Sequence, residues 1–277
     1  MRLLPWLAAG LFAGGVMQSA PKATPGTTLI FAGDTRGYLS PCGCTKPMTG
    51  GIRRLATAVR GLGQKRVLMV NASLVNGVGR QDEIKLETQG EAWAAMGAAA
   101  VNLGASETEL GPGAVSSLAR LANGKLLTGS LAPSPTNELP PSLAGGPVLV
   151  GGASLRARTI ADNLRETPRT LDAAVRDLVD EAKAAKKLPV LMLDGDEAAA
   201  RGLASRFPQL LAIAYRSVGQ PPSKPIVVGK TWLVSPGEEG KFVVRAELKN
   251  GKLSGYSAIK PAPEYRDDPK VSAPTPI

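Results

Sequence analysis

Short apolar runs recur along this chain, each bounded by glycine, proline, aspartate or asparagine. They are rich in valine, leucine and isoleucine, a pattern typical of buried β-strands. The runs predict strands at Thr28–Ala32, Arg66–Asn71, Ala98–Leu103, Lys125–Leu127, Val148–Val150, Val190–Leu193 and Leu210–Ala214.

Helical periodicity fills some of the intervals between these runs. Apolar residues recur at helical spacing over Ile52–Leu62, with arginines on another side of the helix. The clearest helix spans Thr170–Lys187, where lysines gather at the C-terminal end that the helix dipole favours for cations. A third helix is expected over Asp196–Phe207, ended by Pro208.

From Pro225 onward, glycine turns rather than helices join the apolar runs, and Asn250-Gly251 is a strong hairpin signal. An αβ alternation followed by hairpins indicates an α/β fold with strand layers between helices. We expect one domain over residues 27–260 and a loose Pro-rich tail at 261–277. The predicted late strands are Ile226–Val228, Trp232–Val234, Phe242–Leu248 and Leu253–Ile259.

The N-terminus has the three parts of a secretory signal peptide. Arg2 supplies a positive charge, Leu3–Met17 is a short apolar stretch, and Ser19-Ala20 precedes a polar linker at 21–26. The apolar stretch is too short for a transmembrane helix, and no later segment reaches its length. We therefore predict removal of residues 1–20, export to the periplasm or beyond, and no transmembrane anchor.

Composition narrows the function in two ways. The chain has no histidine, which excludes chemistry that needs an imidazole ligand or base, and aromatic residues make up 4%. Because single-stranded nucleic acids are bound by aromatic stacking, no nucleic-acid partner is expected. The net charge of +10 fits either an anionic partner or simply a solvated basic surface.

A longer pattern resembles a known family. Leu29-Ile-Phe-Ala-Gly-Asp34-Thr-Arg36-Gly-Tyr-Leu39, followed by Gly50-Gly51-Ile-Arg53-Arg54, is similar to the opening of the 5′-nucleotidase-like (calcineurin-like) metallophosphoesterases. Further landmarks that resemble the family continue to the hairpin near Gly240. The resemblance implies a four-layer αββα sandwich and, in active members, two divalent metals that polarise a phosphate and generate hydroxide.

The resemblance fails at the metal ligands. Asp34 keeps a ligand identity, whereas Arg36, Ser73, Ala105 and Ser106 stand where the family has histidine, aspartate, asparagine and histidine. Arg36 would also place a fixed positive charge beside the metals. We expect a catalytically inactive, metallophosphoesterase-like protein without a metal cofactor. The alternative is a phosphoester hydrolase with an unusual, reduced divalent-metal site.

Later family ligands are also replaced, since a family histidine falls near Asp194 and a Gly-His-x-His near Tyr215-Arg216-Ser217. Asp34 together with Asp194, Asp196 and Glu197 could form a new Mg²⁺ or Ca²⁺ site. The alternative is that Asp196 caps the following helix and Glu197 complements its dipole.

The two cysteines of the chain stand in Pro41-Cys42-Gly43-Cys44, a motif that resembles an exported subgroup of the family. At this spacing an internal bridge is closable but strained, and strain makes a disulfide easier to reduce. The pair is therefore either redox-active or a structural staple of a loop in an oxidising compartment.

Arginines around the same loop permit a different role. Gly50-Gly51 leads into a helix N-terminus, which attracts anions, and Arg53 and Arg54 follow directly. Arginines on a helix are, alternatively, simply solvated. The predicted binding or redox residues are thus Asp34, Arg36, Cys42, Cys44, Arg53 and Arg54, with an anionic ligand or an envelope protein as partner. The sequence does not fix the oligomeric state.

Overall fold

The computed structural model describes residues 26–41 and 48–271, which fold around two six-stranded sheets. In the first sheet, neighbouring strands from β1 to β4 are parallel. On the other side of β1, β11 pairs antiparallel with β1, and β12 pairs antiparallel with β11. Its order is β12 (Lys252–Ile259), β11 (Val243–Lys249), β1 (Thr27–Ala32), β2 (Arg66–Val70), β3 (Ala98–Asn102) and β4 (Leu126–Leu127).

The second sheet has a parallel centre and antiparallel edges, since β5 and β9 each pair antiparallel with their neighbour. Its order is β5 (Ser142–Gly145), β6 (Val148–Ser154), β7 (Leu188–Asp194), β8 (Ala212–Ala214), β10 (Thr231–Val234) and β9 (Ile226–Val228).

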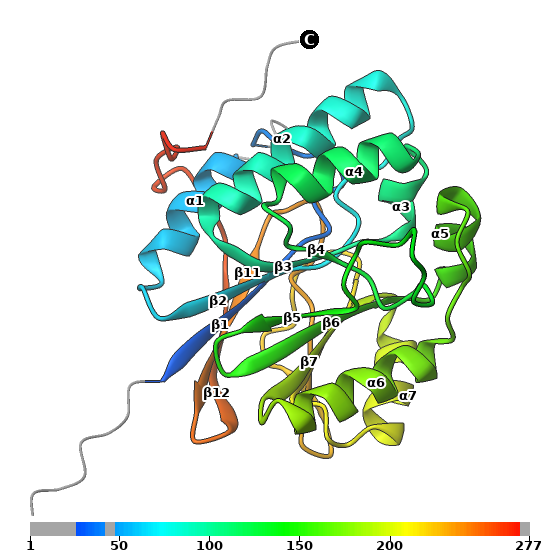
Figure 1. Ribbon diagram of the computed structural model, residues 1–277. Coiled ribbons are helices and arrows are strands. Elements are labelled where there is room, and N and C mark those ends of the chain that lie inside the picture. Colours follow the sequence, from blue (N-terminus) through cyan, green and yellow to red (C-terminus); the bar gives the residue numbers. More distant parts are fainter. Residues whose placement is uncertain (1–25, 42–47, 272–277) are drawn as a thin grey trace, which may run out of the picture.

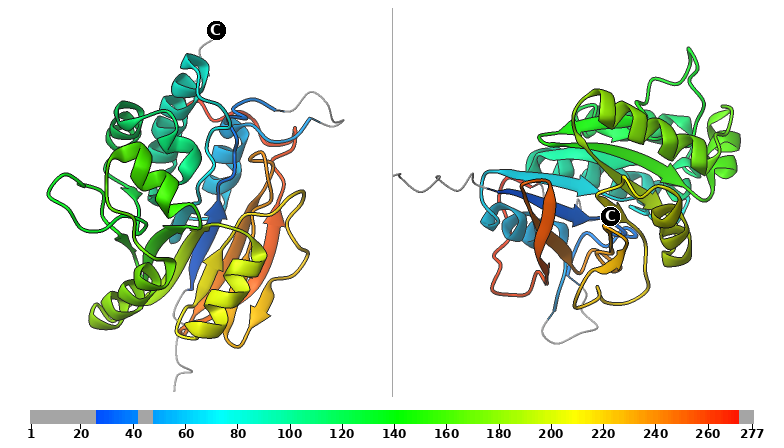
Figure 2. Two further views of the ribbon diagram at one scale, coloured as in Figure 1. Left: turned by 90° about the vertical axis from the view of Figure 1, so that its right-hand side faces the viewer. Right: turned by 90° about the horizontal axis from the view of Figure 1, so that it is seen from below.

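Helices cover the outer face of each sheet, so that the domain has four layers, as Figures 1 and 2 show. This arrangement confirms the predicted strand layers between helices. The first sheet is covered by α1 (Ile52–Gly61), α2 (Arg80–Met96) and α4 (Pro112–Leu121), with α3 (Ala105–Thr108) and α5 (Ala157–Leu164) at its margin. The second is covered by α6 (Leu171–Ala184) and α7 (Glu197–Arg206).

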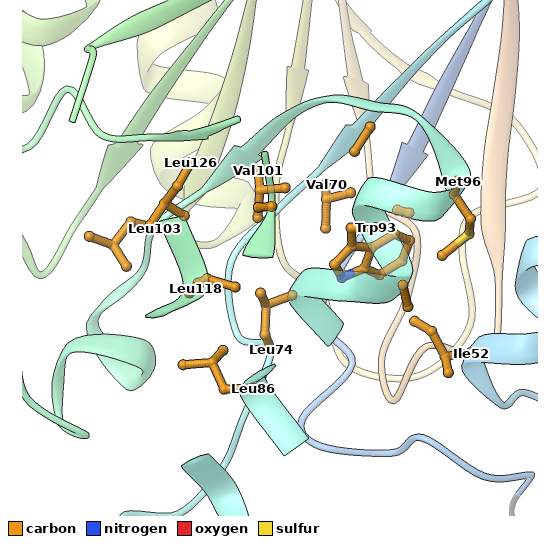
Figure 3. Packing of buried hydrophobic residues seen from close by; sticks show 14 of the residues in the cluster. Ile52, Val70, Leu74, Leu86, Trp93, Met96, Val101, Leu103, Leu118 and Leu126 are labelled. Carbon is orange, nitrogen blue, oxygen red and sulfur yellow. The ribbon is translucent and has the colours of Figure 1, made fainter. Parts of the chain in front are cut away.

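The alternation of side chains along β1 explains why two cores form. Ile30 faces the helices of the first layer, whereas Leu29 and Phe31 face the second sheet. Because successive side chains of a strand point to opposite faces, an entirely apolar strand must be covered on both sides. Figure 3 shows the helix-side core, where Trp93 of α2 lies among aliphatic side chains of the sheet and helices.

The C-terminal segment is held against α1 over its described part. Thr57 Oγ1 donates to the carbonyl of Arg266 at 2.6 Å, and Arg60 pairs with Asp268. Val271 is buried in the helix-side core. Residues 261–271 therefore do not form the loose tail expected from their proline content, because charge pairs and one apolar anchor fix them.

Among the described residues, no helix combines the length and apolar character needed to span a bilayer.

Candidate functional site

The carboxyl ends of the parallel strands bring the candidate residues together. Asp34 follows β1, Ser73 follows β2, Ala105 opens the helix after β3, Asp194 ends β7 and Arg216 follows β8. Because parallel strands of both sheets end at the same side of the domain, side chains far apart in sequence meet there, as ligand sites of α/β folds do.

Asp34 lies at the centre of this site and its side chain is 1% exposed. Arg36 donates to both of its oxygens, from Nε at 2.8 Å and from Nη2 at 3.3 Å. The third guanidinium nitrogen, Nη1, donates to Glu238 at 2.8 Å. Arg36 is therefore fully engaged by two carboxylates, in the planar, bidentate geometry that arginine favours.

The loop that carries Asp34 and Arg36 has an unusual backbone, with φ of +48° at Asp34 and +50° at Arg36. Non-glycine residues adopt this left-handed region at a cost, and such strain gathers at functional sites. Gly33 approaches Asn71 so closely that a Cβ would lie 2.5 Å from the Asn71 carbonyl oxygen. The local sequence therefore fixes the direction in which the Asp34 carboxylate points.

Arg216 links Asp34 to the second sheet. Its Nη1 donates to Asp194 Oδ1 at 3.0 Å, and its Nε lies 3.5 Å from Asp34 Oδ2. Both carboxylates are 1% exposed, and the arginine side chain is 27% exposed. One guanidinium therefore lies between two buried carboxylates that would otherwise repel each other.

Asp194 has further partners from neighbouring loops. Its Oδ2 accepts from Ser154 Oγ at 2.8 Å and from the Ala105 backbone N–H at 3.2 Å. The guanidinium of Arg156 lies 3.8 Å from the same oxygen and 3.7 Å from Glu109. Both contacts of Arg156 are longer than hydrogen bonds, so this arginine keeps hydrogen-bonding capacity toward the solvent.

Glu107 is a buried acid that holds the loops next to the site through hydrogen bonds. Its oxygens accept the N–H groups of Leu74 at 2.6 Å and Gly104 at 2.8 Å, and Ser106 Oγ at 2.8 Å. Burial, assisted by the negative charge of Asp194, raises the pKa of Glu107 above its usual value. Its hydrogen bonds tie the loops after β2 and β3 together.

Burial also raises the pKa of Asp34, although the guanidinium groups of Arg36 and Arg216 act in the opposite direction. The partnership with Asp34 raises the pKa of Arg36, so this guanidinium stays charged. The site is thus a compact network of buried carboxylates in which arginines provide the positive charge.

Two asparagines connect the sheets beneath this network. Asn71 Nδ2 donates to the Leu193 carbonyl at 2.9 Å, and Asn102 Nδ2 donates to the Met192 carbonyl at 3.0 Å. Asn102 also donates to Asn71 Oδ1 at 3.1 Å. These bonds fix the distance between the two sheets where Asp34 and Asp194 approach each other.

A cleft of about 490 Å³ opens beside the network. Its lining carries charge of both signs, from Arg36, Arg156 and Arg216 and from Asp194, Asp196 and Glu197, and Leu155 and Val218 contribute apolar surface. Tyr215 also lines the cleft, and burial raises its pKa to about 12, so it is neutral at physiological pH. The cleft therefore combines apolar surface with charges of both signs, and among its arginines Arg156 has no carboxylate of the described residues within hydrogen-bond distance.

Metal ions do not fit this donor set. The guanidinium of Arg36 already donates to Oδ1 of Asp34, and that of Arg216 donates to Oδ1 of Asp194. The arginines thus occupy carboxylate oxygens that a metal ion would need as ligands. Across residues 26–41 and 48–271, no three His, Cys, Asp or Glu side chains are grouped to hold a metal ion. Asp196 instead accepts the Ala199 N–H as the N-cap of α7, which confirms the capping alternative.

The predicted site residues are brought together only in part. Asp34 and Arg36 are in direct contact. The contacts of Arg53 and Arg54 are with Asp267 of the C-terminal segment, and Arg54 also donates to the Met48 carbonyl. Cys42 and Cys44 lie outside the described residues. The network also contains four residues without a role predicted from the sequence: Ser154, Arg156, Arg216 and Glu238.

No protein-family model matches the sequence, and no curated protein matches it as a relative. Solved structures do match the fold. The 5′-nucleotidase precursor of Thermus thermophilus aligns at a TM-score of 0.69 and 18% identity, over 88% of this chain and 56% of that one. The calcineurin-like phosphoesterase YfkN of Bacillus subtilis aligns at a TM-score of 0.67 and 15% identity, over 89% of this chain and 94% of that one.

Another match is the sulfate thiohydrolase SoxB of Thermus thermophilus, at a TM-score of 0.67 and 16% identity, over 91% of this chain and 58% of that one. The chain thus spans somewhat more than half the length of SoxB and of the 5′-nucleotidase. These matches confirm the predicted fold, which is the αββα sandwich of the calcineurin-like metallophosphoesterases.

Proposed function

We propose that this chain is an exported, catalytically inactive protein that uses a metallophosphoesterase fold for binding. The observation that carries the proposal is the contact of Arg36 and Arg216 with Asp34 and Asp194. Each guanidinium supplies the positive charge that a buried carboxylate needs, and this charge belongs to a side chain of the protein rather than to a bound ion. The network therefore neutralises itself without a metal ion.

Charge explains why the arginines and a metal pair exclude each other. Two divalent ions beside Asp34 would lie within a few ångströms of the guanidinium of Arg36, which cannot lose its proton. Repulsion between such charges is strong in a site that is screened poorly by water. A hydrolytic mechanism that depends on metal-bound hydroxide therefore has no place in this network.

The cleft beside the network supports the binding part of the proposal. Arg156 reaches its carboxylate partners at 3.7 and 3.8 Å, and Leu155 and Val218 provide apolar surface next to it. A small ligand with an anionic group and an apolar body would pair with Arg156 and cover these side chains. An anionic ligand is one of the two partners expected from the sequence, the other being an envelope protein.

The test of inactivity is an assay with p-nitrophenyl phosphate and bis(p-nitrophenyl) phosphate in the presence of Mn²⁺ or Zn²⁺. We expect no turnover above a protein-free control, and the same result for Asp34→Ala. Turnover by the wild type that disappears in Asp34→Ala would establish a surviving hydrolase.

The test of binding uses phenyl phosphate, which combines a dianionic head with an apolar ring. Calorimetric titration should show that Arg156→Gln binds at least about tenfold more weakly than the wild type, the loss expected for a charged hydrogen bond. Arg158→Gln is the matched control, because Arg158 lies two residues further along, in the first turn of α5, and is 87% exposed. Equal affinities of the two variants would contradict the role given to Arg156.

A thiol-redox role for Cys42 and Cys44 is the remaining part of the proposal, and it rests on the sequence.

A further inference from the structure

The amino ends of the parallel strands carry a concentrated positive charge. We define this lysine face as the connections at 62–66, 122–125, 185–187, 229–230 and 249–252. Their sequences are LGQKR, ANGK, AKK, GK and KNGK, which together contain no aspartate or glutamate. The cations of the face are Lys65, Arg66, Lys125, Lys186, Lys187, Lys230, Lys249 and Lys252.

The topology places these connections on one side of the domain. Each of the first four precedes a strand of the parallel parts of the sheets: β2, β4, β7 and β10. The β11–β12 hairpin reaches the same side, because Thr27 at the start of β1 pairs with Leu248 near the end of β11. The hairpin and the start of β1 both lie toward the lower left of Figure 1, and the right-hand view of Figure 2 looks from below.

Contacts join the two sheets across this face. Arg66 and Lys125 of the first sheet line a shared hollow with Gly146 of the second. Lys187 Nζ donates to the carbonyl of the same Gly146. Three of the five connections of the lysine face, at 62–66, 122–125 and 185–187, are therefore continuous across both sheets.

The cations here differ from those of the cleft. Arg36 and Arg216 are paired with buried carboxylates, whereas Lys125, Lys230 and Lys252 are exposed and have no ion-pair partner among the described residues. Unpaired like charges repel each other and offer no benefit to folding. Their concentration on one face indicates an external anionic partner.

The chemistry of the face favours a lipid surface over a nucleic acid. Its cations are lysines with one exception, and lysine acts as a hydrated point charge rather than as a bidentate fork. Its five connections contain no aromatic residue on which a base could stack. Diffuse attraction of several lysines to a charged plane is the mode by which polybasic surfaces bind anionic bilayers.

We propose that the lysine face docks on a bilayer that contains anionic lipids.

The test is co-sedimentation of the full chain with vesicles of phosphatidylcholine alone or mixed with phosphatidylglycerol. The neutral vesicles measure any binding by the apolar stretch. We expect tighter binding to the anionic vesicles, and loss of this difference at about 0.5 M salt, where charges are screened within a few ångströms. Equal binding to both compositions overturns the proposal.

The matched variants localise the effect. Lys125→Gln/Lys230→Gln/Lys252→Gln removes three charges from the lysine face and should weaken binding to anionic vesicles on the order of a hundredfold. The control removes three charges elsewhere, at Lys224, Lys270 and Arg158, and should bind as the wild type does. Equal weakening of both variants overturns the assignment to this face. So does preferential binding of a duplex DNA competitor, which would make the partner a nucleic acid.

Discussion

Replacing Arg216 with methionine removes the guanidinium between Asp34 and Asp194 while keeping an unbranched apolar stem. Both carboxylates are 1% exposed, so the change leaves buried negative charge without its nearest partner. Removing one member of a buried ion pair costs about 3–5 kcal/mol. Because Arg216 is 27% exposed and Arg36 still serves Asp34, we expect a smaller loss, about 2–3 kcal/mol.

The assay is urea denaturation followed by circular dichroism, with thermal unfolding as a second measure. For a domain of this size the expected loss corresponds to a decrease of about 5–10 °C in Tm. The matched control is Arg206→Met, because Arg206 pairs with Asp172 and both side chains are about half exposed. Exposed pairs contribute at most about 1 kcal/mol, so the control should unfold close to the wild type.

A double-mutant cycle separates the ion pair from the lost packing. In the Asp194→Asn background, Arg216→Met should cost about 1 kcal/mol less than in the wild type, because the charge that needed compensation is gone. If Arg216→Met costs no more than Arg206→Met, and the cycle shows no coupling, then Arg216 does not compensate the buried carboxylates and the reasoning is refuted.

Three further predictions concern the support of the site, the sheet packing and the thiols. Burial holds the pKa of Glu107 above its usual 4.5, so the folded state binds the proton more tightly. The free energy of unfolding of the wild type, relative to that of Glu107→Gln, should therefore fall as the pH rises above 4.5. Urea denaturation at a series of pH values measures this difference. Gly152→Ala should cost about 1–3 kcal/mol, because its Cβ would lie 2.1 Å from a buried neighbour, whereas Gly113→Ala, which meets nothing within 4 Å, should not destabilise. Thiol titration should find Cys42 and Cys44 bridged and, in glutathione buffers, easily reduced; two free thiols in fresh protein would contradict this.

Much of the fold was predictable because the central strands of both sheets are apolar on both faces. The predicted strand Ile226–Val228 coincides with β9, and the other predicted strands overlap observed ones. The helix α2 was missed, although it is the longest among the described residues. Its buried face includes Gln89 and Gly90, which interrupt the apolar period on which the prediction depended.

The positions that surround the site were predictable from the family resemblance, but the contacts among their side chains were not. Asp34 and Arg36 stand in one motif, whereas Arg216 and Glu238 come from connections that only the folded sheets bring to Asp34. The signal for Arg216 was its position where the resembling family has Gly-His-x-His. Its ion pairs with Asp34 and Asp194 could not be predicted, because they depend on how the two sheets are packed.

The central claim is that arginines take the place of metal ions in this site, and metal content tests it most directly. The full chain is purified with a histidine-free affinity tag, equilibrated with Mn²⁺ and Zn²⁺, and passed through a desalting column. The metal content per chain is then measured by inductively coupled plasma mass spectrometry. We predict no stoichiometric metal and the same melting temperature with and without EDTA. Two metal ions per chain, together with a melting temperature that EDTA lowers, would contradict the account.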